Sequence, residues 1–306
     1  MALKDRIPFG MVLPHRFANP LPVEDIRRVA QRADEIGFRD LWVTENTLDD
    51  AYSLDAMVIL TYAAAVTRRI GLGAAVVVLP VHHPIHIAHQ IASLDYLSNG
   101  RAILGIGIGN KEDYHDFQVP LERRVRRFRE RVELMKALWT RERVHFQGEI
   151  FNLPDSAITL KPIQKPHPPL WLGGLHPDAL SRAVELGSGW IGGGVQTSAG
   201  FASTVPALRN ALDKAGRDPA GFTISKRIFM AVDDNAATAK AEVHRWFTDV
   251  YRRPHLADTA GAYGTPEQVR EQLEELISAG ATHLLLNAIS RYPEQVEALA
   301  EVVGLK

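Results

Sequence analysis

The chain has 306 residues, enough for about two average domains or for one α/β barrel of about 250 residues with insertions. Its 35 Lys and Arg residues nearly balance 36 Asp and Glu residues, and the net charge of −1 argues against nucleic acid as a partner. The lack of cysteine excludes disulfides, thiolate metal sites and a cysteine nucleophile. No apolar stretch approaches the roughly 18 residues of a membrane span, so we expect a soluble, cytoplasmic protein with no membrane partner.

The first half of the chain alternates apolar strand patterns with amphipathic helix patterns. Apolar runs predict strands at 7–13, 39–44, 70–79 and 101–108. Helical periodicity predicts helices at 22–37, 52–67, 84–97 and 121–139. The strands begin about 32 residues apart, which is the length of a βαβ unit, so the repeat indicates a parallel sheet.

The second half resumes the same alternation after an irregular segment. Residues 144–169 break the pattern with glycine, five prolines and alternating apolar residues, which we interpret as an insertion after the fourth βα unit. Strands are then predicted at 170–173, 189–192, 222–232 and 283–287, with helices near 176–187, 199–215, 235–251, 266–279 and 293–303.

Eight apolar strands in series predict one closed α/β barrel. Continuous apolar strands are typical of a sheet buried on both faces, and no low-complexity linker divides the chain. We therefore predict a (β/α)₈ TIM barrel formed by residues 1–306 as a single domain. The alternative is a doubly wound open sheet, whose nucleotide-binding fingerprint belongs in the first unit. The nearest match, Gly105-x-Gly107-x-Gly109, lies on the fourth strand with the wrong last spacing.

In such a barrel the chemistry belongs at the carboxyl ends of the strands. His15 follows the first strand, and Glu45 and Asn46 follow the second. Glycine-bearing loops follow the fourth, fifth and sixth predicted strands at 107–110, 173–176 and 192–196. This set is poor in charge, which favours a slot for a flat, mostly apolar cofactor whose phosphate meets backbone N–H groups. The alternative is that the glycines only permit tight turns.

Four of the twelve histidines cluster at the start of one predicted helix, at positions 82, 83, 86 and 89. Their spacing could place imidazoles on one helical face, as in a zinc site. However, no carboxylate is interleaved with them, and Pro84 separates the first two from the helix. We therefore predict no metal, and we expect His83, directly before Pro84, to face the barrel mouth.

One long segment, together with several shorter ones, resembles a known family. Residues 69–109 read RIGLGAAVVVLPVHHPIHIAHQIASLDYLSNGRAILGIGIG, and residues 33–46 read ADEIGFRDLWVTEN. Residues 134–139 (LMKALW), FQGEIFNL and KPIQKPHPPLWLGG within 146–174, and LGSGWIGGG at 186–194 follow in order. These segments closely resemble the bacterial luciferase-like superfamily of flavin and deazaflavin oxidoreductases. They cover most of the first two-thirds of the chain.

The resemblance implies a TIM-like barrel that binds the deazaflavin coenzyme F420, or alternatively FMN, at its mouth. It implies a non-proline cis peptide at Ala75–Val76, where a bulge backs the flavin ring. The implied cofactor contacts, in chain order, are Glu45, Ala74, Ala75, Val76, Gly107, Gly109, Asn110, Gly173, Gly174, Gly192 and Gly193. Of these, Gly192 and Gly193 match the phosphate end.

Three positions depart from the family pattern. Asn46 stands where luciferases and deazaflavin-dependent sugar-phosphate dehydrogenases carry a catalytic histidine, and an amide does not exchange a proton near neutral pH. Asn110 replaces the dehydrogenase acid, and Ile108 replaces the arginine that holds FMN phosphate in luciferase. These differences argue against both of those activities and favour F420 over FMN.

The sequence therefore predicts hydride transfer between F420 and a small organic substrate. We expect Asn46 to orient the substrate and His15 or His83 to handle any proton. The alternative within the family is an FMN-dependent monooxygenase that uses reduced flavin and O₂. A zinc hydrolase built on the histidine cluster and a non-catalytic flavin-binding homologue are further hypotheses. The resemblance also implies a homodimer, with contacts through the helices predicted at 52–67 and 84–97.

Overall fold

Eight parallel strands close into a barrel in the computed structural model, which describes all of residues 1–306. In chain order they are β1 (Phe9–Val12), β3 (Asp40–Val43), β5 (Gly71–Val78), β6 (Ala102–Gly107), β9 (Leu170–Gly173), β10 (Gly189–Gly192), β11 (Thr223–Val232) and β13 (His283–Ala288). Each strand pairs in parallel with the next, and β13 pairs with β1 to close the ring. The predicted TIM barrel is confirmed, and the doubly wound alternative is wrong.

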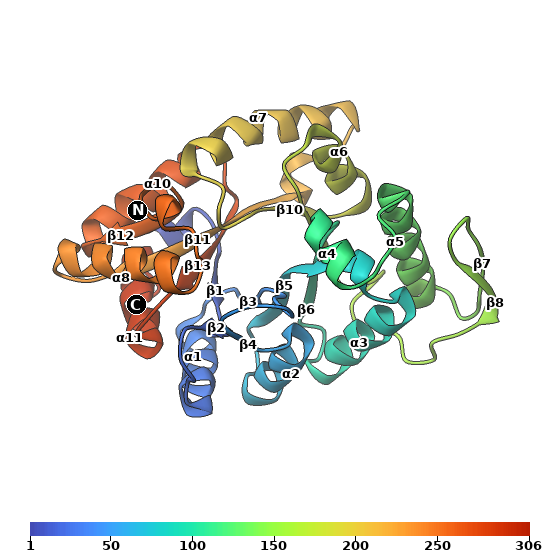
Figure 1. The fold of residues 1–306 in the computed structure, drawn as a ribbon, viewed down its shortest axis with the longest axis horizontal. Coiled ribbons are helices and arrows are strands. Elements are labelled where there is room, and N and C mark those ends of the chain that lie inside the picture. The colour runs from blue at the N-terminus through green and yellow to red at the C-terminus, as the bar shows by residue number, and fades with distance from the viewer.

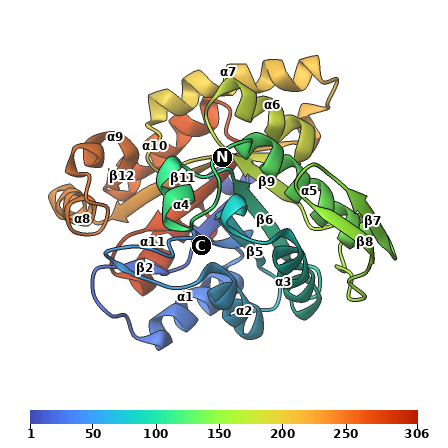
Figure 2. The same cartoon turned by 45° about the vertical axis from the view of Figure 1, so that its right-hand side comes forward.

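Helices surround the barrel, as Figures 1 and 2 show. They are α1 (Val23–Ile36), α2 (Ala56–Val66), α3 (Pro84–Leu97), α4 (Lys111–Asp116), α5 (Arg124–Thr140), α6 (Pro177–Leu186), α7 (Ser198–Lys214), α8 (Ala236–Asp249), α9 (Ala257–Ala260), α10 (Pro266–Ser278) and α11 (Tyr292–Val303). Short 3₁₀ helices occur at η1 (Leu3–Asp5), η2 (Leu79–Val81), η3 (Pro219–Gly221) and η4 (Pro254–Leu256). None of the helices is long and apolar enough to span a membrane.

Several elements differ from the sequence-based prediction, among them two helix starts and a strand beside the barrel. Helix α2 begins at Ala56 rather than at 52, because β4 (Tyr52–Ser53) pairs with β2 (Arg16–Phe17) and the Asp55 carboxylate caps the helix. Helix α5 begins at 124 rather than at 121. The unpredicted strand β12 (Gly261–Gly264) pairs in parallel with the far end of β11, outside the closed ring.

Residues 144–156 form an antiparallel hairpin beside α5. Its strands are β7 (Val144–Gln147) and β8 (Asn152–Ser156), and they project from the right-hand side of the molecule in Figure 1. The buried carboxylate of Glu130 on α5 accepts hydrogen bonds from the backbone N–H groups of Glu149, Ile150 and Phe151 at 2.9–3.1 Å. One side chain thus satisfies the whole turn of the hairpin and fixes it to the barrel helices.

The lower interior of the barrel is filled by aromatic rings around one buried carboxylate. Trp42 and Trp171 stack with ring centroids 4.8 Å apart. Asp40, at the amino end of β3, accepts hydrogen bonds from Trp42 Nε1 at 2.5 Å and His283 Nε2 at 3.1 Å. A Cβ on Gly73 would lie 2.5 Å from the Trp42 ring, so only glycine leaves room for this packing. The carboxyl ends of the strands are therefore the open end of the barrel.

Candidate active site

Two adjoining cavities open at the carboxyl ends of the barrel strands. The first, of about 200 Å³, we call the aromatic cavity, because Phe229, Trp246, Tyr251 and Tyr292 line part of it. The second, of about 290 Å³, we call the glycine cavity, because Gly107, Gly109, Gly173, Gly174, Gly192 and Gly193 line it. Both share Ala75, Val76 and Arg227. Each is smaller than a typical cofactor site of roughly 300–1,000 Å³, so a ring system with a substrate needs both.

The end of β5 forms the surface shared by the two cavities. The Ala75–Val76 peptide bond is cis, and the β5–β6 register shifts between Ala74 and Val77. This bulge turns Ala75 and Val76 toward the cavities. Ala74, predicted to contact the cofactor with them, lies instead in the outer core between barrel and helices, because its side chain points to the opposite face of the strand.

Glu45 lines the aromatic cavity with its carboxylate held by two donors. The backbone N–H of Val78 donates to Oε2 at 2.7 Å, and His82 Nε2 lies 2.5 Å from Oε1. The guanidinium of Arg131 on α5 in turn binds the backbone carbonyls of His82 at 3.1 Å and Pro80 at 2.9 Å. The segment after β5 is therefore anchored so that His82 reaches Glu45.

His83 is not the histidine that faces the mouth, contrary to the prediction. Its side chain is exposed, accepts a hydrogen bond from the backbone N–H of Ile85 at the start of α3, and packs edge-on against Phe151. Burial and the nearby His86 lower the pKa of His83. Because Pro84 begins the helix, His83 becomes its N-cap and turns outward. No group of three or more His, Asp or Glu side chains is arranged to hold a metal ion.

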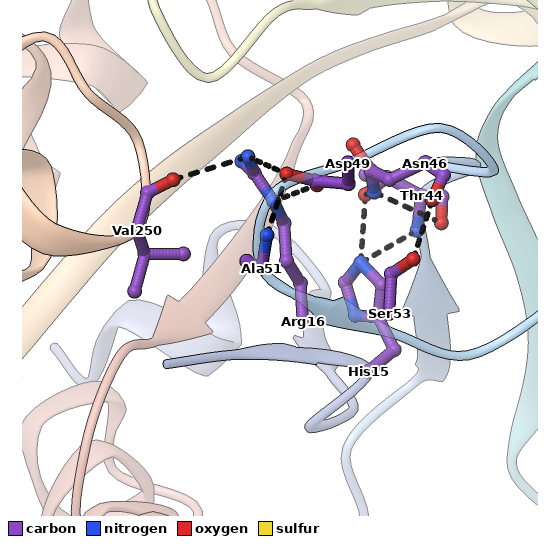
Figure 3. Close-up of polar contacts among 8 residues, drawn as sticks. All are labelled: His15, Arg16, Thr44, Asn46, Asp49, Ala51, Ser53 and Val250. Atoms are coloured by element: carbon purple, nitrogen blue, oxygen red, sulfur yellow. Dashed lines mark hydrogen bonds and ion pairs between the residues drawn. The ribbon is translucent and has the colours of Figure 1, made fainter. Parts of the chain in front are cut away.

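His15, Thr44 and Asn46 form a hydrogen-bonded chain, drawn in Figure 3. His15 Nδ1 donates to the Leu13 carbonyl at 2.7 Å, which leaves Nε2 to accept from the Thr44 hydroxyl at 2.7 Å and the Thr44 N–H at 3.0 Å. The Asn46 amide donates to the Thr44 hydroxyl at 2.6 Å. Burial lowers the pKa of His15 to about 4, so the ring is neutral at neutral pH.

This chain decides which atoms of the three residues face a ligand. Both nitrogens of His15 are occupied by protein partners, so His15 holds Thr44 in place and has no free nitrogen for a substrate. The Asn46 amide nitrogen is also occupied, while its Oδ1 accepts from no protein group and Asn46 lines the cavity. Asn46 therefore presents an oriented hydrogen-bond acceptor.

Two arginines that line the cavities, Arg16 and Arg227, were not predicted from the sequence. Arg16 lines the aromatic cavity and pairs with Asp49 at 2.5 Å, while also donating to the Val250 carbonyl at 3.2 Å (Figure 3). Arg227 projects from β11 into both cavities. Two charged residues, Lys226 and Arg227, in the middle of a predicted strand were the signal available in the sequence, because such residues need a partner or a polar cavity.

The glycine cavity contains space that the fold itself does not require. A Cβ on Gly193 would meet nothing within 4 Å, and one on Gly173 would make an ordinary 3.4 Å contact with Val76. Gln196 lines the same cavity, and its Oε1 is buried without a hydrogen-bond partner. Asn110, a predicted contact, is instead the exposed N-cap of α4, bonded reciprocally with Asp113. Its side chain lies outside both cavities because the cap uses it.

Comparison with known proteins assigns the family. Residues 7–261 match the family described as Luciferase-like monooxygenase. The chain belongs to this family. It is 30% identical over 292 residues to an F420-dependent glucose-6-phosphate dehydrogenase of Kineococcus radiotolerans, covering 85% of each chain. It is 29% identical to an F420-dependent hydroxymycolic acid dehydrogenase of Mycobacterium tuberculosis, covering 86% of this chain and 70% of that one.

A solved structure shares the fold of this chain. The coenzyme F420-dependent tetrahydromethanopterin reductase from Methanopyrus kandleri superposes with a TM-score of 0.81 at 20% identity, covering 97% of this chain and 98% of that one. Together with the sequence relatives, the family match makes this chain a luciferase-like oxidoreductase. Relatives in the family point to F420 or a flavin as the cofactor.

Proposed function

We propose that the protein transfers a hydride between coenzyme F420 and a small organic substrate bound in the aromatic cavity. The observation that carries this proposal is the unfilled space at Gly173 and Gly193 in the cavity that Val76 also lines, in a family whose relatives include F420-dependent dehydrogenases. A fold that needed glycine there for its own packing would bring other atoms against the missing Cβ, as it does at Gly73.

The residues around the glycine cavity fit a deazaflavin. Ala75 and Val76 give a small apolar surface for a flat ring, and Glu45 lies at its side with a fixed carboxylate. Backbone N–H groups at Gly192 and Gly193 suit a phosphate. Ile108 lines this cavity where luciferase places a phosphate-binding arginine, which favours F420 over FMN. When bound, F420 supplies or accepts the hydride.

The chain's own residues would orient the substrate rather than exchange its proton. Asn46 Oδ1 accepts a hydrogen bond from a substrate hydroxyl or N–H, and Thr44 and His15 keep that oxygen in position. The low pKa of His15 and its two occupied nitrogens argue against our expectation that it handles a proton. The carboxylate that lines the aromatic cavity is that of Glu45, which is bonded by His82, and the His82 side chain is 30% exposed.

Titration of the apoprotein with F420 and, in parallel, with FMN tests the cofactor assignment. Cofactor fluorescence is followed at fixed ionic strength while protein is added. We expect F420 to bind with micromolar or lower Kd and FMN to bind at least tenfold more weakly. Tighter binding of FMN would transfer the assignment to an FMN-dependent monooxygenase, and binding of neither would overturn the proposal.

We also propose that the protein is a homodimer through α2 and α3. Val58 on α2 is 69% exposed and Leu97 on α3 is 66% exposed, and a shallow cavity lined by Met57, Leu94 and neighbours lies between the two helices. Exposed apolar side chains grouped on adjacent helices are typical of a subunit interface. We expect light scattering at micromolar concentration to give twice the chain mass and Val58→Glu to give the monomer mass. A wild-type monomer would exclude the dimer.

A further inference from the structure

Arg227 lies where the two cavities meet, and it has no counter-ion. Its guanidinium carbon is 4.8 Å from the centroid of the Phe229 ring, in contact with that ring's face. No Asp or Glu carboxylate forms an ion pair with it, and none is among the groups that act on its protonation. Burial lowers the pKa of Arg227, and the neighbouring Tyr251 opposes that effect. An arginine nevertheless stays charged at neutral pH.

The other charged groups at or beside the cavities are bonded to partners within the protein. Arg16 is paired with Asp49, and Glu45 is bonded by His82 and the Val78 N–H. Lys226, the neighbour of Arg227, is only 2% exposed, and its Nζ donates to the carbonyls of Gly193 and Arg227. Arg227 is therefore the one cavity-lining cation whose charge is left for a ligand.

The surroundings of Arg227 define the rest of that ligand. Phe229, Trp246 and Tyr251 form an aromatic wall on one side of it, with Phe229 and Trp246 centroids 4.5 Å apart. Asn46 Oδ1 supplies an acceptor from the end of β3. A planar guanidinium binds a carboxylate through two parallel hydrogen bonds, and the bond is strong where water is displaced.

We propose that the substrate is an organic anion, with an apolar or aromatic body against Phe229 and Trp246 and a carboxylate-type oxyanion on Arg227. This inference names the substrate class of the proposed oxidoreductase and so rests on that function. The binding step itself does not depend on the cofactor, because the aromatic wall, Arg227 and Asn46 all belong to the chain.

Isothermal titration calorimetry with benzoate and benzamide tests the inference. The two probes have nearly the same shape and differ in charge. Both are titrated into the wild-type protein with and without F420, and into Arg227→Met. The control is Arg129→Met, which makes the same change in net charge on α5, where Arg129 pairs with Glu185 away from the cavities. We expect wild type and Arg129→Met to bind benzoate at least tenfold more tightly than benzamide, and Arg227→Met to bind both equally.

Three results would overturn the inference. Wild-type protein could bind both probes equally or bind neither, which needs no variant and therefore no assumption about folding. Arg129→Met could lose the preference as fully as Arg227→Met. Arg227→Met could keep the benzoate preference and instead weaken F420 binding, which would make Arg227 a cofactor contact. Since benzoate is also titrated without F420, failure of the F420 proposal and failure of this one give separate signals.

Discussion

The two ends of the barrel treat buried charge in opposite ways. At the amino ends of the strands, Asp40 is 1% exposed and is bonded by Trp42 and by His283, which in turn lies 2.9 Å from the Ser225 hydroxyl. At the carboxyl ends, Arg227 faces two cavities without a counter-ion. A fully hydrogen-bonded buried network stabilises the folded structure. A partly buried charge without a counter-ion lowers stability but remains able to bind an oppositely charged ligand.

The same contrast applies to glycine. Gly10 and Gly73 are required at the closed end, where a Cβ would collide with Asp40 or with the Trp42 ring. Gly173 and Gly193 at the open end leave space that no protein atom fills. Gly10 and Gly73 therefore serve packing, whereas Gly173 and Gly193 leave room that a ligand could occupy.

The largest expected effect is at the closed end. Asp40→Ala leaves the Trp42 and His283 ring nitrogens without their acceptor in a dry interior, so we expect the free energy of unfolding to fall by about 4 kcal/mol. Guanidinium-induced unfolding measures this change. The control Asp234→Ala, at an exposed position, should change stability by less than about 0.5 kcal/mol. Equal effects of the two variants would refute the network.

Acid should destabilise the protein, because His15 is buried in its neutral form. Its pKa is about 4 in the folded protein and 6.5 in its ordinary state, so the unfolded chain binds more protons between these values. The contribution of neutral His15 to the free energy of unfolding is fully present above pH 6.5. It is lost as the pH falls toward 4, and the loss is about 2.5 kcal/mol between about pH 7.5 and pH 4.5. The His15→Asn variant should lack this pH-dependent part of the free energy of unfolding. Denaturant unfolding of the wild type and the variant at both pH values measures the difference. Identical pH dependence in both would contradict a neutral His15.

Gly173→Val tests the space at the open end. The new side chain enters the cavity with ordinary contact to Val76, so we expect an unchanged melting temperature and a loss of F420 affinity of about 100-fold. Gly221→Val, at another position where a Cβ meets nothing, is the control and should keep full affinity. A large fall in melting temperature for Gly173→Val would mean that this glycine serves packing.

Asn46→Ala should have a smaller effect, limited to the substrate. Removal of one oriented acceptor should lower kcat/KM about tenfold while the Kd for F420 stays constant. Thr44→Val, which removes the hydroxyl that holds the Asn46 amide, should give a part of the same loss. Unchanged kinetics in Asn46→Ala would remove this residue from the substrate site.

The sequence predicts the barrel well because strand periodicity and apolar continuity are local signals. The eight strands fall where the apolar runs of the chain lie. The errors occur where a distant partner decides the local structure. Residues Tyr52–Ser53 pair with β2 instead of joining α2, and β12 forms because the end of β11 offers an edge. Neither partner is visible in a short window of sequence.

The site is predictable to the level of loops but not of side-chain directions. Gly107, Gly173 and Gly192 line a cavity because any residue at those strand ends does so. Ala74, Asn110 and His83 fail because strand alternation and helix capping turn their side chains elsewhere. His82 and Arg227 were missed because the contact with Glu45 and the lack of a counter-ion exist only in three dimensions.

The most direct test of the contrast between the two ends is the unfolding free energy of ligand-free Arg227→Met. Methionine keeps much of the volume beside Phe229 and removes a buried charge that no carboxylate balances. The account predicts that the free energy of unfolding rises by about 1 kcal/mol relative to wild type. A fall of the size expected for Asp40→Ala would show that Arg227 is part of the scaffold and would contradict an open end built for ligands.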